Sequence, residues 1–151
     1  MLRARLSEAL KTAMRDRDQR AVSTVRLILA ALKDRDIAAR GKGNADGIAE
    51  PEILQLLQTM VKQRRESIEL YAKGGRQDLV DQEAGEIAVI ERFMPQQMDE
   101  AAMAAAIATV VAEAGATGIK DMGRVMALLR ERHAGQMDFT RASVLVKQAL
   151  G

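Results

Sequence analysis

The chain has 151 residues, of which 48% are hydrophobic, 29% are charged and 2% are aromatic, and it contains no cysteine. This length suits one compact unit or two small ones. The lack of cysteine excludes a disulfide scaffold, a thiolate metal site and a cysteine nucleophile. No apolar run approaches the roughly 20 residues needed to cross a membrane, and residues 1–11 lack a secretory signal pattern. We therefore expect a cytoplasmic protein without membrane contact.

The composition favours an all-α fold, because helix-forming residues are abundant and the aromatic and β-branched clusters typical of strands are few. In the first part of the chain, hydrophobic periodicity and Gly or Pro signals predict four helices. They cover about residues 2–15, a stripe from Val22 to near Ala39, residues 51–73 and residues 77–93. Pro95 cannot continue the fourth helix, so we predict an N-terminal helical domain over residues 1–94.

Three shorter helices are predicted beyond Pro95, forming a C-terminal bundle over residues 98–151. Asp99 and Asp138 are well placed as N-caps of the first and the last of them, over residues 100–114 and 139–150. The middle helix starts near Met122 and ends before Gly135. We expect the last helix to bury Val144 or Leu145, together with Ala149.

Charge is unevenly distributed along the chain. Residues 1–46 carry 11 basic and 6 acidic side chains, residues 47–100 carry 6 and 11, and residues 101–151 carry 6 and 4. One interpretation is two basic surfaces around an acidic middle. The alternative, which we weight more heavily from charge alone, is solvated helix faces whose charges pair at i,i+4 spacing.

The sequence lacks the residue combinations that enzyme chemistry requires. The lone His133 stands among cations at the end of a helix, where it has no marked partner for a catalytic triad. The carboxylates between Glu66 and Glu91 fit surface pairing better than acid–base catalysis, and no glycine run has the spacing of a phosphate-binding loop. We assign no catalytic residue, no metal ligand and no cofactor.

Nucleic-acid binding is compatible with the sequence in one form only. Three scattered aromatic residues cannot build a base-stacking platform, whereas recognition of a folded RNA through its phosphates needs only suitably placed cations. The candidate RNA-binding residues lie in the C-terminal bundle and in the third helix. They are Lys120, Arg124, Arg130, Arg132, Arg141 and Lys147, and Lys62, Arg64 and Arg65.

Several blocks together resemble the YqeY-like proteins. They are KQRRESIELY (residues 62–71), GRQDL (75–79), FMPQQ (93–97) followed by Asp99 and Glu100, and DMGRVM (121–126) with Val146 and Lys147. The last block also resembles the tail domain of GatB, the tRNA-binding subunit of glutamine-dependent aminoacyl-tRNA amidotransferases. The resemblance extends over nearly the whole chain.

This resemblance implies an all-α, two-domain protein with a family link to carbon–nitrogen ligases that use glutamine as amido-N-donor. In the amidotransferase the tail contacts tRNA while catalysis occurs elsewhere, so the link favours binding over catalysis. The family usually has a cation where this chain has Gln136. Because Met137 and Phe139 also depart from the family pattern, we expect these two to form an apolar patch for a protein partner.

Three hypotheses follow. The one we favour is an accessory binding protein for tRNA or another folded RNA. The second is an adaptor that docks on an amidotransferase or another translation-related protein without touching RNA. The third, which we rank last, is an enzyme in its own right; we do not expect activity of the isolated chain, and any activity would be as part of a glutamine-dependent amidotransferase system. Kinship of fold does not decide among them.

Overall fold

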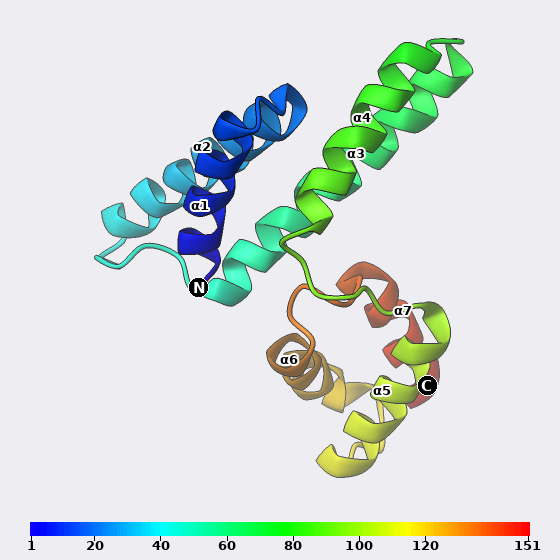
Figure 1. Cartoon of the computed structure of the whole chain (residues 1–151). Helices are drawn as coiled ribbons and strands as arrows, with labels where there is room; N and C mark the ends of the chain where they lie inside the picture. The colour runs from blue at the N-terminus through cyan, green and yellow to red at the C-terminus, as the bar shows by residue number, and fades with distance from the viewer. The chain divides into compact units, whose positions relative to one another are not determined.

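The computed structural model describes residues 1–151 and contains helices without strands, which confirms the all-α fold class. The chain divides into two compact units, Met1–Met94 and Pro95–Gly151. Figure 1 shows the order of the elements, which are α1 (Leu2–Arg15), α2 (Gln19–Gly41), α3 (Glu50–Lys73), α4 (Gln77–Glu91), α5 (Glu100–Ala114), the short 3₁₀ helix η1 (Ile119–Asp121), α6 (Met122–Arg132) and α7 (Phe139–Leu150).

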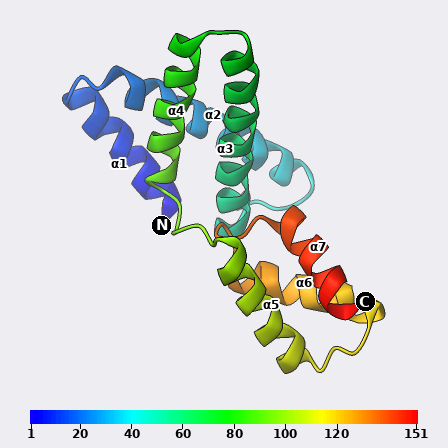
Figure 2. The ribbon, with the colours of Figure 1, turned by 90° about the vertical axis from the view of Figure 1, so that its right-hand side faces the viewer.

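The first unit consists of two helical hairpins. Helices α1 and α2 lie side by side, and α3 and α4 form the second hairpin, as Figures 1 and 2 show. Each helix turns an apolar stripe inward, and the most deeply buried side chains include one from each of them. These are Leu6, Ile28, Leu57 and Ile90. One continuous core therefore holds the four helices together.

Two helix ends in this unit differ from the predicted ones. Helix α2 starts at Gln19, three residues before the predicted stripe, because the Asp18 side chain accepts a hydrogen bond from the Ala21 amide and caps the helix. Helix α4 ends at Glu91, two residues early, yet Phe93 remains buried beyond its end. The predicted positions and order of the four helices are otherwise close to the observed ones.

The second unit is a bundle of α5, α6 and α7 around its own core. Asp99 caps α5 by accepting from the Ala102 amide at 2.7 Å, and Asp138 caps α7 by accepting from the Thr140 and Arg141 amides. Both capping predictions are confirmed. The burial prediction for α7 is correct only in part: Leu145 packs half-buried against the core, whereas Val144 and Ala149 are exposed and the fully buried residues are Ala142 and Val146. Apolar residues occur on most sides of this helix, so periodicity alone does not fix its inward face.

A short seam of hydrogen bonds joins the start of the second unit to the loop before α7. The Gln97 side chain donates to the Gly135 carbonyl at 2.5 Å, and the Met98 amide donates to the Gln136 carbonyl at 2.8 Å. The segment that follows Pro95 is therefore an integral part of this unit. In the whole chain, no single helix has the length and hydropathy to cross a membrane; α5 with the following Ile119–Arg132 segment meets those criteria only as a pair bent by 96°.

Candidate functional site

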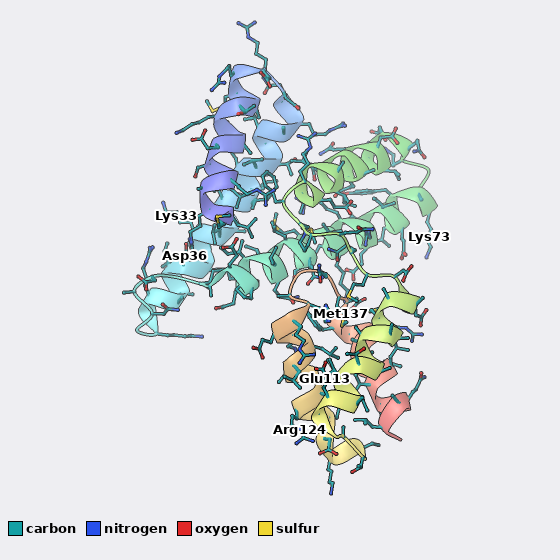
Figure 3. The ribbon with its side chains drawn as sticks, turned by 60° about the horizontal axis from the view of Figure 1, so that its bottom comes forward. Lys33, Asp36, Lys73, Glu113, Arg124 and Met137 are labelled. Carbon is teal, nitrogen blue, oxygen red and sulfur yellow. The ribbon has the colours of Figure 1, made fainter.

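Three of the six predicted RNA-binding cations in the second unit form ion pairs with carboxylates. Arg124 lies 3.2 Å from Asp121, one helical turn away, and Figure 3 labels its position on α6. Arg132 pairs with Glu113 of α5, and Arg141 pairs with Glu100 at the start of α5. The last two pairs join α6 and α7 to α5. They also offset much of the positive charge expected on this surface.

The Asp121 side chain also stabilises the turn before α6. Its carboxylate accepts from the Thr117 amide at 2.9 Å, and this backbone hydrogen bond is the main reason why the pKa of Asp121 is lowered. The neighbouring cations Arg124 and Lys120 lower the pKa further. Asp121 is thus a stable negative charge at the N-terminal end of α6, close to two candidate cations.

The other three cations of this unit, Lys120, Arg130 and Lys147, have no carboxylate partner. Arg130 lies over the ring of Phe139, 5.8 Å from its centroid, a separation typical of a cation–π contact. Lys120 and Arg130 are ten residues apart along η1 and α6, which corresponds to about 15 Å. They therefore do not form a single cluster.

The second unit as a whole is electrically balanced. Residues 95–151 carry six Lys or Arg and six Asp or Glu side chains. The excess of cations over residues 101–151 disappears because Asp99 and Glu100 belong to this unit. The unit therefore has no net attraction for a polyanion.

The candidates on α3 have different environments. Arg64 is mostly buried and pairs with Glu86 of α4 at 2.9 Å, and it also donates to the Met60 carbonyl. Arg65 lies 4.0 Å from Glu91, and Lys62 is exposed without a carboxylate partner. Arg64 thus joins the two helices of a hairpin, and of these three residues only Lys62 offers an uncompensated charge.

The expected apolar patch of Met137 and Phe139 does not form. Met137 has 0% of its surface exposed and fills the core of the bundle, where Figure 3 labels it among α5, α6 and α7. Phe139 is half-buried beneath Arg130. Met137 belongs to the same buried cluster as Ala142 and Val146 of α7. The exposed large apolar residues of this unit are Ile119 and Val144.

The titratable groups considered for catalysis are also placed by the structure. His133 ends α6 with its Nδ1 3.4 Å from the Gln136 side-chain oxygen. On α4, partial burial and the nearby Glu86 raise the pKa of Glu83. No three His, Asp or Glu side chains come close enough to hold a metal ion.

The largest excess of cations along the chain lies in residues 1–46, the segment that contains α1 and α2, and none of the predicted RNA-binding residues belongs to it. Of the 11 cations in residues 1–46, only Arg3 and Lys11 have carboxylate partners. The nine others are Arg5, Arg15, Arg17, Arg20, Arg26, Lys33, Arg35, Arg40 and Lys42. Only four carboxylates of this segment, Asp16, Asp18, Asp34 and Asp46, are outside ion pairs.

Buried Asp36 is not available to neutralise these nine cations. Its carboxylate accepts two hydrogen bonds from Arg3 and one from the Ile48 amide at 2.9 Å. The Arg3 guanidinium is the main cause that lowers the pKa of Asp36 to about 2. Asp36 is 5% exposed, and Figure 3 shows it on the same stretch of α2 as Lys33. Its negative charge is therefore used inside the fold.

Comparison with known proteins gives relatives that carry a single name. The chain is similar to Altered inheritance of mitochondria protein 41, mitochondrial, from Lachancea thermotolerans (34% identity over 62% of this chain and 48% of the relative). It is also similar to the proteins of that name from Eremothecium gossypii (40%, over 60% and 48%) and Saccharomyces cerevisiae (34%, over 58% and 45%). The matches thus span about half the length of these curated relatives.

These names contradict the expected cytoplasmic location, because each of these relatives is named as a mitochondrial protein. The expectation was wrong because it rested only on what the sequence lacks. A wider match comes from a family model. The model described as Yqey-like protein matches residues 3–150, which is nearly the whole chain and includes both units. The chain belongs to the YqeY-like family.

Proposed function

We propose that this protein is an accessory RNA-binding protein, with tRNA as its preferred ligand. The observation that carries the proposal is the excess of cations outside ion pairs in residues 1–46, nine against four carboxylates. Arg and Lys side chains with free donors are the groups that contact nucleic-acid phosphates. The resemblance of the second unit to the GatB tail supports the choice of tRNA.

The chemistry that this surface supports is binding. Exposed cations attract a polyanion and release its condensed counterions, which supplies affinity without reading a sequence. In the proposed role, the protein holds a folded RNA while a glutamine-dependent amidotransferase or another translation enzyme performs the covalent chemistry. Lys120, Arg130 and Lys147 of the second unit are available for additional phosphate contacts, as is Lys62 on α3.

The test is a titration of fluorescently labelled tRNA with the full chain, followed by anisotropy at several salt concentrations. We expect micromolar or tighter binding whose logarithm falls linearly with the logarithm of the salt concentration. Each phosphate contact contributes about 0.7 to 0.9 to the slope. Absence of binding at low salt would overturn the proposal.

A second candidate function is supported by the second unit. Its charges are balanced, and Ile119 and Val144 are 52% and 42% exposed. An adaptor that docks on a translation-related protein through such a surface would bind with little dependence on salt. Calorimetry with a purified amidotransferase tests this directly. A heat of binding that Val144→Ser and Ile119→Ser together abolish supports the adaptor, and no heat of binding rules out this partner.

A further inference from the structure

Three cations form a line along one edge of α2. Arg26, Lys33 and Arg40 follow one another at intervals of seven residues, and all three are exposed. Seven residues are nearly two turns of helix, so successive members are displaced by only about 20° around the axis. The three side chains therefore project from one edge over about 21 Å. We refer to Arg26, Lys33 and Arg40 as the α2 cationic edge.

No carboxylate neutralises this edge. Asp36 has the right spacing to do so, since it follows Lys33 by three residues and precedes Arg40 by four. However, Arg3 and the Ile48 amide occupy its carboxylate on the buried side. The charge of Arg40 contributes to the lowered pKa of Asp36, but less than the Arg3 hydrogen bonds do.

The other carboxylate on this part of α2 points elsewhere. Asp34 is adjacent to Lys33 in the chain, and adjacent helical residues project about 100° apart. It forms no ion pair in the structure, and neither do the three cations of the edge. Arg40 has one donor occupied, since its Nε donates to the Ala45 carbonyl at 3.2 Å. Its two terminal amino groups remain available for a ligand.

The geometry of the edge fits a nucleic acid better than a membrane. A helix that lies on a lipid surface inserts its apolar face among the acyl chains. The apolar face of α2 is already buried in the core of the first unit, with Ile28 and Leu32 almost without exposed surface. Of the two large exposed apolar residues of α2, Ile37 lies beside the edge, whereas Leu27 projects about 100° away from Arg26. A line of cations with a single apolar neighbour suits a regularly spaced row of phosphates.

We propose that the α2 cationic edge binds the phosphate backbone of a folded RNA, with each of its cations contacting a separate phosphate. The inference rests on the proposed RNA-binding function and assigns that function to α2 of the first unit rather than to the second unit. The contacts are independent of base sequence, because no aromatic side chain is present on α2 to stack on a base.

The experiment compares two variants of the full chain that lose the same charge. The edge variant carries Arg26→Ala, Lys33→Ala and Arg40→Ala. The control variant carries Lys73→Ala, Arg76→Ala and Arg92→Ala, three exposed cations of the same unit that lie outside α1 and α2. Circular dichroism first establishes that both variants have the helix content and melting temperature of the wild type. Labelled tRNA is then titrated at several salt concentrations between about 50 and 300 mM.

We expect the edge variant to lower the slope of log affinity against log salt by about 2 to 3, since three phosphate contacts are lost. Its affinity should fall at least about tenfold at 0.1 M salt, while the control variant changes the slope by less than about 1. If the edge variant does not fold, the single substitution Lys33→Glu on the exposed surface replaces it. That substitution should lower the slope by about 1.

The possible failures are distinguishable. If the wild type binds no tRNA even at low salt, the proposed function is wrong and this inference falls with it. If the wild type binds and the edge and control variants weaken binding equally, RNA binding stands but the assignment to α2 is wrong. The assignment to α2 is also wrong if the slope of log affinity against log salt falls only in a variant of the second unit that carries Lys120→Ala, Arg130→Ala and Lys147→Ala. Edge-dependent binding to vesicles with phosphatidylserine, without binding to tRNA, would instead identify a membrane-surface site.

Discussion

The Arg3 guanidinium donates hydrogen bonds to both carboxylate oxygens of Asp36, although the two residues are 33 positions apart in the chain. Arg3 also donates to the Ile48 carbonyl at 2.7 Å, and Asp36 accepts from the Ile48 amide. One ion pair thereby fixes α1 to α2 and closes the connection from α2 to α3. At this corner, hydrogen bonds and an ion pair hold the helices together, whereas apolar contacts do so in the rest of the unit.

Loss of this pair should be costly. Arg3→Ala leaves the buried Asp36 carboxylate with only the Ile48 amide as a hydrogen-bond partner. We expect the free energy of unfolding to fall by about 2–3 kcal/mol, measured by urea denaturation. The matched control is Lys11→Ala, which breaks the exposed Lys11–Glu8 pair and should cost less than about 1 kcal/mol. Equal effects of the two substitutions would contradict the role assigned to Arg3.

The same network predicts a pH dependence of stability. The pKa of Asp36 is about 2 in the folded protein and 3.8 as its ordinary value. A depressed carboxyl pKa contributes stability above the ordinary value, and that contribution is lost as the pH falls through the folded pKa. We expect urea midpoints of the wild type to decline between about pH 4 and pH 2. In Asp36→Asn this part of the decline should be missing; an unchanged pH profile would contradict the assignment.

Gly47 is the glycine on which this corner depends. Its φ is +81°, and a Cβ there would lie 2.3 Å from Asp36 Oδ1. Gly47→Ala therefore adds a collision with a held carboxylate to the cost of a left-handed backbone. Gly43→Ala is the matched control, because Gly43 has φ +94° and nothing within 4 Å of its Cβ position. We expect Gly43→Ala to cost about 1 kcal/mol and Gly47→Ala clearly more, measured by thermal unfolding.

Met137 provides the test for the second unit. Because it is fully buried, Met137→Ala should leave a cavity and destabilise this unit by about 2–5 kcal/mol. Val144→Ala, on the exposed side of α7, should change stability by less than about 1 kcal/mol. Hydrogen exchange of amides in residues 95–151 measures both. Faster exchange in the Val144 variant than in the Met137 variant would show that the inward face of this unit is assigned wrongly.

The sequence was most informative where a signal is local. Helix periodicity, Pro95 and the Asp99 and Asp138 caps depend on residues within one or two turns, and the observed helices begin and end close to where these signals place them. The inward face of α7 was predicted only in part, with Leu145 half-buried but Val144 and Ala149 exposed, because this face depends on what packs against the helix. Met137 reaches the core from outside α7, and no periodicity within α7 encodes that contact.

The candidate site was harder to predict because a cation is available to a ligand only when no carboxylate neutralises it, and the sequence does not show which carboxylates lie nearby. Arg132 and Glu113 are 19 positions apart, and Arg141 and Glu100 are 41 apart, so their pairing depends on tertiary structure. The cations of α2 were overlooked for the opposite reason. Lys33 and Arg40 stand near Asp36 in the sequence, and only the fold shows that Arg3 has taken this carboxylate. The seven-residue spacing of the edge was the signal available in advance.

The seam between residues 97–98 and residues 135–136 decides where the chain can be cut. A fragment that starts at Pro95 keeps the Gln97 and Met98 donors, whereas one that starts at Asp99, where the first helix of the bundle is capped, removes them. The buried Gly135 and the neighbouring Gln136 then lose the partners of their carbonyl groups. Each carbonyl left without a partner costs about 1–3 kcal/mol when it stays out of water. A fragment for spectroscopy should therefore include residues 95–98, although they precede the first helix of the bundle, because it is less stable without them.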